Sequence, residues 1–449
     1  MRVDDFDNTL VCEPGDLSYM VKYFKQYISI PEYIEKGIID IIFKYLGIDR
    51  IPYNTIEKEL ARIPKGALEK IIKSINNMFF DNDKIIYDNR YLSYLIYYLL
   101  VNIYKVWKPL IDLHTRSILK PQMQILDIGT GPGSIPIGVI EFYKTLAETY
   151  TNIEFSLNFT FIEKEIEFIK IATDMIDFIK KCLPTNLEIS IDSIYNDIVS
   201  KDYVNNKLKK YDLIIMSNFL AINEMDNQYN AVSIVNNFYK YLYKDGSLII
   251  INPGDSNNTK ILNMTRNKLI NEGKFNLYSP CNSIWEEKKT YNCNCFNMTK
   301  AYYQVPKIHE YLVREGMNKN LREGVPFSYI VLRIDALRKY KIEQNNQHYI
   351  QLKDLKSYDG KNVNISAIIR TVYYKEDNII LTLCDGTLDY KGFQEIVWLN
   401  LSNEELELNN IDISLIAGDK ITIRKAKVKL NNSAVNLYLS TESKIRIDY

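Results

Sequence analysis

The chain contains little cysteine and little histidine, 6 and 3 residues respectively among 449. So few cysteines in so long a chain do not form a disulfide framework, and in a reducing compartment a local group of thiols more often binds metal or takes part in catalysis. The three histidines, His114, His309 and His348, lie outside the strands that carry the motifs below. Each is interpreted as a surface or structural residue, so the catalytic residues remain unknown.

Net charge and long apolar runs are also absent. The 56 basic residues balance the 56 acidic ones, so binding to nucleic acid or to a membrane surface needs a local patch. The most apolar run, 91–104 (YLSYLIYYLLVNIY), is shorter than the roughly 20 residues that span a bilayer, and we interpret it as a buried helix. The acidic start, MRVDDFDNTLVCEPGD, disfavours a secretory signal or a transit peptide. We expect a cytoplasmic protein that does not enter the membrane.

The remaining composition, 46% hydrophobic and 25% charged, is that of a folded protein of two or three domains. Residues 1–119 are predicted as an N-terminal helical region, because apolar residues recur there at spacings of three and four. Residues 120–340 alternate short β-branched strands with helices, which predicts an α/β domain with a mostly parallel sheet. After a polar linker, residues 349–449 contain five closely spaced strands with a helical insert before the fourth, as in an OB-like β-barrel.

A glycine-rich turn follows the first predicted strand of the α/β domain. The segment 124–138, QILDIGTGPGSIPIG, places Asp127 at the strand end and Gly129, Gly131 and Gly133 in the turn. The third glycine comes one residue too early for the G-x-G-x-x-G spacing of dinucleotide folds. The spacing D-x-G-x-G-x-G resembles that of class I S-adenosylmethionine (SAM)-dependent methyltransferases, in which glycines let the backbone approach the amino acid tail of the ligand. The alternative is a turn that only connects a strand to a helix.

The same resemblance implies roles for residues at the ends of later strands. Glu163, in FTFIEKE, corresponds to the acid that takes the ribose hydroxyls, and Asp197 is the candidate for the adenine. Ser217 and Asn218 end the fourth strand, at the mouth of the predicted site. The sequence SNFLAINE, which contains both, lacks the Asn/Asp-Pro-Pro-aromatic arrangement of many amino-group methyltransferases.

Half of the cysteines lie in one short stretch, 281–295 (CNSIWEEKKTYNCNC). Thiolates suit zinc or an iron–sulfur cluster, and both normally need four ligands. Cys281, Cys293 and Cys295 supply three, and Cys384, in the strand NIILTLCDG, is the candidate for the fourth. The alternatives are a nucleophilic cysteine in the Pro280-Cys281 pair, or small buried side chains.

Taken in chain order, these motifs resemble the mitochondrial and bacterial small-ribosomal-subunit methyltransferase-like assembly family. The resemblance rests on the glycine turn, the Pro-Cys pair, the Cys-x-Cys-Phe at 293–296, PFSYIVLR at 326–333 and ILTLCDG at 380–386. It implies a cysteine-ligated iron–sulfur cluster, [4Fe-4S], that joins the α/β domain to the barrel; zinc is the alternative metal. The implied ligands are Cys281, Cys293, Cys295 and Cys384. The chain departs from the family where SIWEEKK replaces a Cys-Pro pair and NCNCF replaces a Trp-Cys-His-Phe string, which puts the ligand set in doubt.

The barrel adds a candidate RNA surface, because OB-type barrels bind single strands with aromatic side chains and a basic groove. The candidates are Tyr373, Tyr374, Trp398, and the alternating lysines Lys425, Lys427 and Lys429. The sequence therefore predicts a SAM-binding protein that methylates or binds RNA, with small-subunit rRNA as the implied partner. The rival hypotheses are a methyltransferase acting on tRNA, DNA or protein with structural zinc, and a non-catalytic RNA-binding assembly factor. The sequence leaves the oligomeric state open.

Overall fold

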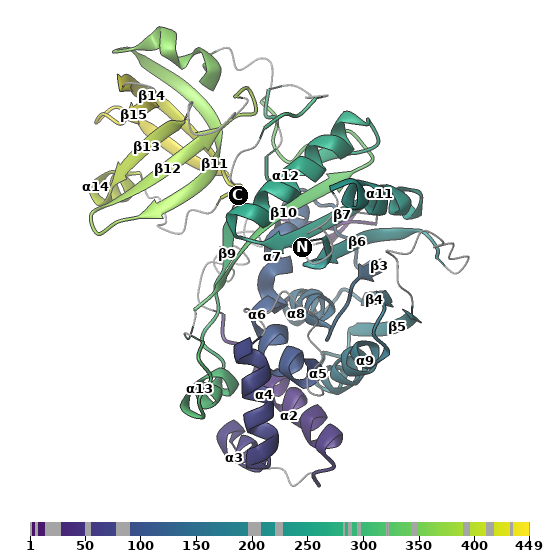
Figure 1. The fold of residues 1–449 in the computed structure, drawn as a ribbon. Coiled ribbons are helices and arrows are strands. Elements are labelled where there is room, and N and C mark those ends of the chain that lie inside the picture. The colour runs from purple at the N-terminus through teal and green to yellow at the C-terminus, as the bar shows by residue number, and fades with distance from the viewer. Residues whose placement is uncertain are drawn as a thin grey trace. The chain divides into compact units, whose positions relative to one another are not determined.

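The computed structural model describes most of the chain (Figure 1). The described residues are 2–4, 8–13, 28–49, 55–77, 90–195, 208–220, 228–281, 283–285, 290–293, 298–319, 321, 323–342, 348–388, 396–409, 417–431 and 434–448. They fold into two compact units. The first comprises Met1–Ile111, Ser117–Lys207 and Lys300–Val325, and the second Asp112–Arg116, Leu208–Thr299 and Pro326–Tyr449.

Helices make up the first part of the chain, as predicted. They are α2 (Glu32–Leu46), α3 (Ile56–Leu60), α4 (Lys65–Asn77), α5 (Arg90–Ser93), η1 (Tyr94–Tyr98), α6 (Leu99–Asn102), η2 (Ile103–Val106) and α7 (Trp107–His114); two short strands, β1 (Arg2–Val3) and β2 (Leu10–Val11), precede them. The leucine and isoleucine side chains of the tyrosine-rich run are buried and most of its tyrosines are half-buried; along its length the geometry changes from α to π, back to α and then to 3₁₀. None of the helices in the described part of the chain is long and apolar enough to cross a membrane.

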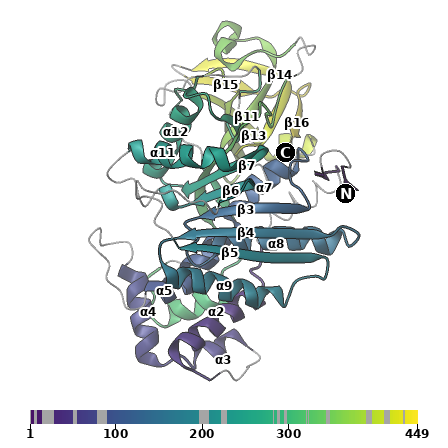
Figure 2. The same ribbon diagram turned by 90° about the vertical axis from the view of Figure 1, so that its right-hand side faces the viewer.

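Three parallel strands form the sheet of the first unit: β3 (Gln122–Ile128), β4 (Phe155–Glu163) and β5 (Leu187–Tyr195) (Figure 2). Helices α8 (Ser134–Thr149) and α9 (Ile166–Lys180) connect them, and α13 (Lys307–Arg314) belongs to the same unit. The second halves of β3 and β4 are nearly continuous buried runs, as expected of parallel strands that are covered on both faces, whereas buried and exposed residues alternate in the edge strand β5. Their carboxyl ends carry the glycine turn and Glu163.

The second unit has a mixed sheet. Strands β6 (Tyr211–Ser217) and β7 (Leu242–Pro253) are parallel, and β10 (Val325–Arg333) runs antiparallel between β7 and β8 (Asn276–Ser279). The remaining elements here are α11 (Gln228–Phe238), η3 (Tyr239–Tyr241) and α12 (Ser256–Asn271); the short β9 (Thr299–Ala301) begins in this unit and continues in the first. The antiparallel strand β10 is the predicted segment PFSYIVLR. The fold is therefore mixed α/β with a mostly parallel, Rossmann-like sheet, as predicted.

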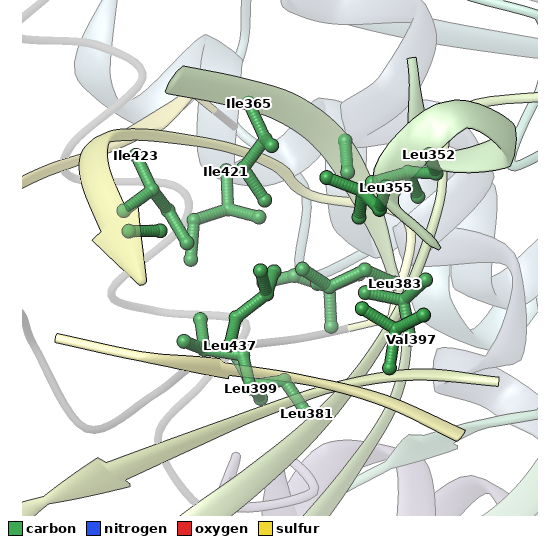
Figure 3. Packing of buried hydrophobic residues seen from close by; sticks show 14 of the residues in the cluster. Leu352, Leu355, Ile365, Leu381, Leu383, Val397, Leu399, Ile421, Ile423 and Leu437 are labelled. Carbon is green, nitrogen blue, oxygen red and sulfur yellow. The ribbon is translucent and has the colours of Figure 1, made fainter. Parts of the chain in front are cut away.

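A closed five-stranded barrel ends the chain. Its strands are β11 (Asn362–Tyr374), β12 (Asn378–Cys384), β13 (Val397–Ser402), β14 (Lys420–Asn431) and β15 (Ala434–Tyr438), with η4 (Leu352–Tyr358) before them and α14 (Asn403–Leu408) between β13 and β14. The pairing order β11-β12-β13-β15-β14 closes through β11–β14, and β13 and β15 are parallel. Figure 3 shows the apolar interior, to which alternate residues of each strand contribute. The OB-like topology is confirmed; a sixth strand, β16 (Lys444–Asp448), was not predicted.

Candidate functional site

The turn between β3 and α8 depends on its glycines. Gly129, Gly131 and Gly133 have φ of 73°, 55° and 95°, a region that other residues avoid. The Gly129 N–H donates to the Ile162 carbonyl oxygen at 2.8 Å, which ties the turn to β4. Gly133 caps the N-terminus of α8. The Gly133 N–H donates to the Thr130 carbonyl oxygen at 3.1 Å, so the turn is held within itself and leads directly from β3 into the start of α8.

The glycines differ in what surrounds them. A Cβ on Gly131 would meet no atom within 4 Å, so this backbone is open to a close neighbour. A Cβ on Gly133 would lie 3.2 Å from the Cβ of Ala172, so this glycine lets α8 pack against α9. Gly131 is therefore the position at which a ligand can approach the chain.

Asp127 lies at the end of β3 with only 2% of its surface exposed, and its Oδ2 atom has no hydrogen-bond partner. Burial raises the pKa of Asp127 to about 7; a hydrogen bond with Thr130 opposes the rise, and the charge of Glu163 adds to it. A buried acceptor without a donor is costly. The arrangement suits a ligand that brings a cationic donor.

Glu163 ends β4 and binds the turn itself. Its Oε2 accepts the Gly131 N–H at 2.9 Å, and its Oε1 accepts the N–H groups of Lys164 and Glu165 at 2.8 and 3.1 Å. A carboxylate has about four acceptor positions, so about one stays open for a ligand hydroxyl. The same side chain thus orders the glycine turn before any ligand binds.

The other predicted cofactor residues are less fully described. Ser217 ends β6 in the second unit. Asn218 follows it with a φ of 55°, and its N–H donates to the Ile251 carbonyl at 2.7 Å. Asp197 lies outside the described residues. The roles of these three residues stay predictions.

Cys281 and Cys384 lie together although they are far apart in sequence. Both line one small cleft, with Pro280, Ile368, Ile369, Arg370 and Gly418 as its other lining residues. Cys293 is buried in the hydrophobic cluster of the barrel, against which Cys281 and Cys384 also pack. Cys295 lies outside the described residues, and within those residues no group of three or more His, Cys, Asp or Glu side chains is arranged to hold a metal. Cys12 and Cys182 belong to the first unit.

Tyr291 adds a buried ring to this region. Burial raises the pKa of Tyr291 to about 12; a backbone hydrogen bond from Ser283 and the charge of Arg266 oppose the rise, and the thiols of Cys281 and Cys384 add to it. Its hydroxyl is therefore within electrostatic reach of both thiols.

Helix α12 holds the chain between Tyr291 and Cys293. The Cys293 carbonyl oxygen accepts hydrogen bonds from Arg266 Nη2 at 2.8 Å and Asn267 Nδ2 at 3.2 Å. Asn271 bonds the backbone of Tyr291 twice, since its Oδ1 accepts the N–H at 2.8 Å and its Nδ2 donates to the carbonyl at 3.2 Å. We call these three side chains the α12 clamp. Sequence reasoning missed it, although Asn263, Asn267 and Asn271 recur every four residues along one helix face.

A second set of contacts fastens the start of the cysteine segment to β12. Asp385, which is fully buried, accepts hydrogen bonds from Trp285 Nε1 at 2.7 Å and from the Leu352 N–H at 2.8 Å. Gly386 has a φ of 85°, and a Cβ there would lie 2.5 Å from Ser283 Cα. The Cys-Asp-Gly run in the predicted motif therefore combines a thiol, a hydrogen-bond hub and a close backbone approach.

A sequence model of the family described as "Mitochondrial small ribosomal subunit Rsm22" matches residues 92–391. The match covers the glycine turn, the α12 clamp and all four candidate ligands. The chain belongs to the Rsm22 family. Comparison with curated proteins found no match.

Several solved structures similar to this Rsm22-family chain are methyltransferases, at low similarity. A putative class I SAM-dependent methyltransferase from Listeria monocytogenes has 12% identity and a TM-score of 0.31, and the match covers 73% of this chain and 88% of that one. The plantazolicin methyltransferase BpumL with S-adenosylhomocysteine has 12% identity and a TM-score of 0.30, over 63% and 100%. A methyltransferase from Pyrococcus furiosus has 14% identity and a TM-score of 0.27, over 50% and 80%.

Two of the histidines of this Rsm22-family chain are buried. His309 stacks on Tyr97 with ring centroids 4.9 Å apart, and burial lowers the pKa of His309 to about 4. His114 is also buried, whereas His348 is exposed. The neutral, stacked ring of His309 fits the structural role expected from the sequence.

The barrel exposes several of the candidate RNA residues, while Trp398 is partly buried and also packs against the interior cluster. Tyr373 is 49% exposed, and its ring centroid lies 6.2 Å from that of Trp398. Of the three lysines, Lys425 pairs with Glu442 at 2.7 Å and has a φ of 58°, at a register shift in the β11–β14 pairing. Lys427 and Lys429 alternate with buried residues and point outward. The side chain of Tyr374 lies outside the described part of the chain.

Proposed function

We propose that this chain binds SAM at the turn between β3 and α8. The buried, unpartnered oxygen of Asp127 is the observation that carries the proposal, because the ammonium group of the ligand's amino acid tail would satisfy it. The open backbone at Gly131 would admit that tail, and the remaining acceptor position of Glu163 would take a ribose hydroxyl.

Within this proposal, Gly129 and Gly133 shape the turn. Asp197 keeps its predicted role at the adenine, and Ser217 and Asn218 theirs at the mouth of the site. SAM supplies a methyl group on a sulfonium centre; the residues of the chain bind and orient it.

We further propose that the RNA of the small ribosomal subunit is the partner, in ribosome biogenesis. Support comes from membership in a family whose description names the mitochondrial small ribosomal subunit. The sequence led us to expect a cytoplasmic location, whereas the family description names mitochondria. The location therefore stays a prediction, which cell fractionation would test.

The proposed metal centre is an iron–sulfur cluster, [4Fe-4S], held by Cys281, Cys293, Cys295 and Cys384. Cys281 and Cys384 line one cleft, and all three described cysteines pack in or against the hydrophobic cluster of the barrel, in which Cys293 is buried. The assignment of Cys295 rests on the resemblance. Thiolates from two distant segments would then be cross-linked by one centre, which gives it a structural role.

Titration calorimetry with SAM tests the cofactor, and transfer of labelled methyl groups to purified small-subunit RNA tests turnover. We expect saturable binding. Binding with transfer supports an RNA methyltransferase, and binding without transfer to any nucleic acid or protein pool supports a non-catalytic assembly factor. The absence of SAM binding contradicts the proposal.

Anaerobic purification followed by iron, sulfide and zinc analysis tests the centre. We expect iron and sulfide in equal amounts, and their loss in Cys384→Ser. Cys182→Ser is the matched control, because Cys182 is exposed and belongs to the other unit. If the chain contains stoichiometric zinc and no iron, the iron–sulfur assignment is wrong and the site is a zinc site.

A further inference from the structure

Outward-facing side chains of the barrel form rows across neighbouring strands. Trp398 on β13 lies opposite Asn436 on β15, which lies opposite Lys429 on β14. Trp398 and Asn436 each stand between two buried residues of the barrel interior, such as Leu399 and Leu437, and Lys429 follows the buried Val428. Trp398, Asn436 and Lys429 therefore share the outer surface, because side chains alternate along a strand.

A second row runs beside the first. Tyr438 on β15 lies opposite Lys427 on β14, and Tyr373 on β11 lies opposite Ile380 on β12. Tyr438 is 42% exposed, and the Lys429 ammonium lies 6.0 Å from its ring centroid. Tyr373, Trp398 and Tyr438 thus present three rings on one outer surface. We call these rings, with Lys427 and Lys429, the aromatic stripe.

Charge is unbalanced along the aromatic stripe. Among the described residues, no carboxylate forms an ion pair with Lys427 or Lys429, whereas Lys425 next to them pairs with Glu442. The two lysines therefore leave positive charge at the β14 side of the aromatic stripe. Phosphate groups complement that charge.

We propose that the aromatic stripe binds single-stranded RNA, with bases stacked on Tyr373, Trp398 and Tyr438 and phosphates on Lys427 and Lys429. The inference deepens the proposed function, because it specifies the form of RNA and the surface that holds it. Base–aromatic stacking is strong and tolerant of sequence. Followed around the outside of the barrel, the three strand steps from Tyr373 on β11 to Tyr438 on β15 cover about 14 Å, enough for a few nucleotides, and the lysines lie one step further on β14.

The surroundings favour this ligand over duplex RNA and over protein. A duplex buries the faces of its bases, so exposed rings would gain little from it. A protein partner is usually held by an apolar centre depleted of charge. Apart from Ile380, the outward-facing positions paired with the stripe are polar, Asn400 and Asn436, or are the two lysines.

Fluorescence anisotropy of the full chain with a labelled oligouridine of about 10 nucleotides tests the proposal, with a duplex of the same length as the comparison. We expect the dissociation constant to rise about 10-fold in Trp398→Leu and in Tyr438→Leu. Lys427→Gln and Lys429→Gln should weaken binding and each lower the salt dependence by about one phosphate contact.

Lys425→Gln is the matched control for charge, because its ion pair leaves it outside the aromatic stripe. Tyr243→Leu is the matched control for the rings, because Tyr243 is 41% exposed but belongs to β7. Both should bind as the unaltered chain does. The lysine and tyrosine variants should keep their melting temperatures, and Trp398→Leu, whose ring packs against the barrel interior, should remain folded at the assay temperature.

Undiminished oligouridine binding in the stripe variants overturns the inference and leaves the proposed RNA function intact. Equal affinity for duplex also overturns it. If the unaltered chain binds neither oligouridine nor small-subunit RNA, both the inference and the proposed RNA function are contradicted. Loss of a protein partner in these variants, with RNA affinity unchanged, would assign the surface to protein instead.

Discussion

One buried carboxylate, Asp127, sets the pH dependence expected of the glycine turn. Its pKa is raised from 3.8 to about 7, so the folded chain takes up a proton that the unfolded chain has released. Folding therefore loses stability as pH rises from about 4 to about 7, and the loss is complete above the folded pKa. Only the ionised form can pair with the ammonium of SAM.

We therefore expect the affinity for SAM to rise with pH through about 7. Asp127→Asn should bind SAM at least about 10-fold more weakly at pH 8, because a charge-assisted hydrogen bond is lost, and it should no longer show this pH dependence. Calorimetry at several pH values measures both effects. Asp192→Asn, which changes an exposed carboxyl on β5, is the control. An unchanged pH profile in Asp127→Asn would assign the titration to another group.

A single residue of the α12 clamp, Asn271, restrains the backbone next to Cys293. Asn271→Ala removes both hydrogen bonds to the Tyr291 backbone and should lower the free energy of unfolding by about 1–3 kcal/mol. Because the segment that carries Cys293 is then less restrained, we expect less iron per chain after anaerobic purification. Asn257→Ala changes an exposed asparagine on the same helix and should alter neither quantity. If Asn271→Ala retains the full iron content, the α12 clamp stabilises the fold but does not help to hold the metal centre.

At the scale of the element, two glycines allow the effect of a substitution on stability to be distinguished from its effect on SAM binding in the turn between β3 and α8. Gly131 and Gly273 both have positive φ, and a Cβ on either would meet no atom within 4 Å. Alanine at either position should cost about 1–2 kcal/mol of stability, because both adopt a left-handed conformation. Only Gly131→Ala should also weaken SAM binding, since its methyl group would occupy the open approach. Thermal unfolding and calorimetry on both variants test this; equal SAM affinities would remove Gly131 from the contact.

Elements were predictable where the sequence pattern had one dominant cause. Buried parallel strands need continuous apolar residues, so β3, β4 and β6 could be located from the sequence, and the barrel order followed from strand spacing. Strand β16 was missed because KIRID is short and mostly polar and depends on its pairing with β14. The tyrosine-rich run was correctly predicted as buried, but its π-turn arises from packing that periodicity does not encode.

The candidate site was predictable only in part, for a similar reason. Glycines with positive φ and an acid at a strand end leave a local signature, and so do clustered cysteines. The approach of Cys384 to Cys281 was inferred from the need for a fourth ligand and from the family resemblance, because no local pattern records that tertiary folding brings the two segments together. Arg266 left no signal, and the motif that contains Asp385 did not indicate its role, since the partners of both side chains lie in distant segments.

At the scale of the whole molecule, the proposed metal centre would couple segments that lie far apart in the sequence. Cys281 follows β8, Cys293 precedes β9, and Cys384 ends β12. A centre that binds all three raises the free energy needed to open any one of them, because opening then requires a ligand to leave. The strands β3, β4 and β5 contribute no ligand.

Hydrogen exchange on the metal-loaded and chelator-treated chain measures this coupling. After metal removal we expect backbone amides in 276–293 and 378–388 to exchange at least about 10-fold faster, which corresponds to a loss of about 1.4 kcal/mol in local opening free energy. Amides of β3–β5 should change little. Cys182→Ser, treated in the same way, controls for the chelator. Uniform acceleration over the whole chain would mean that the centre supports global folding, and no acceleration in either segment would mean that the thiols meet without cross-linking them.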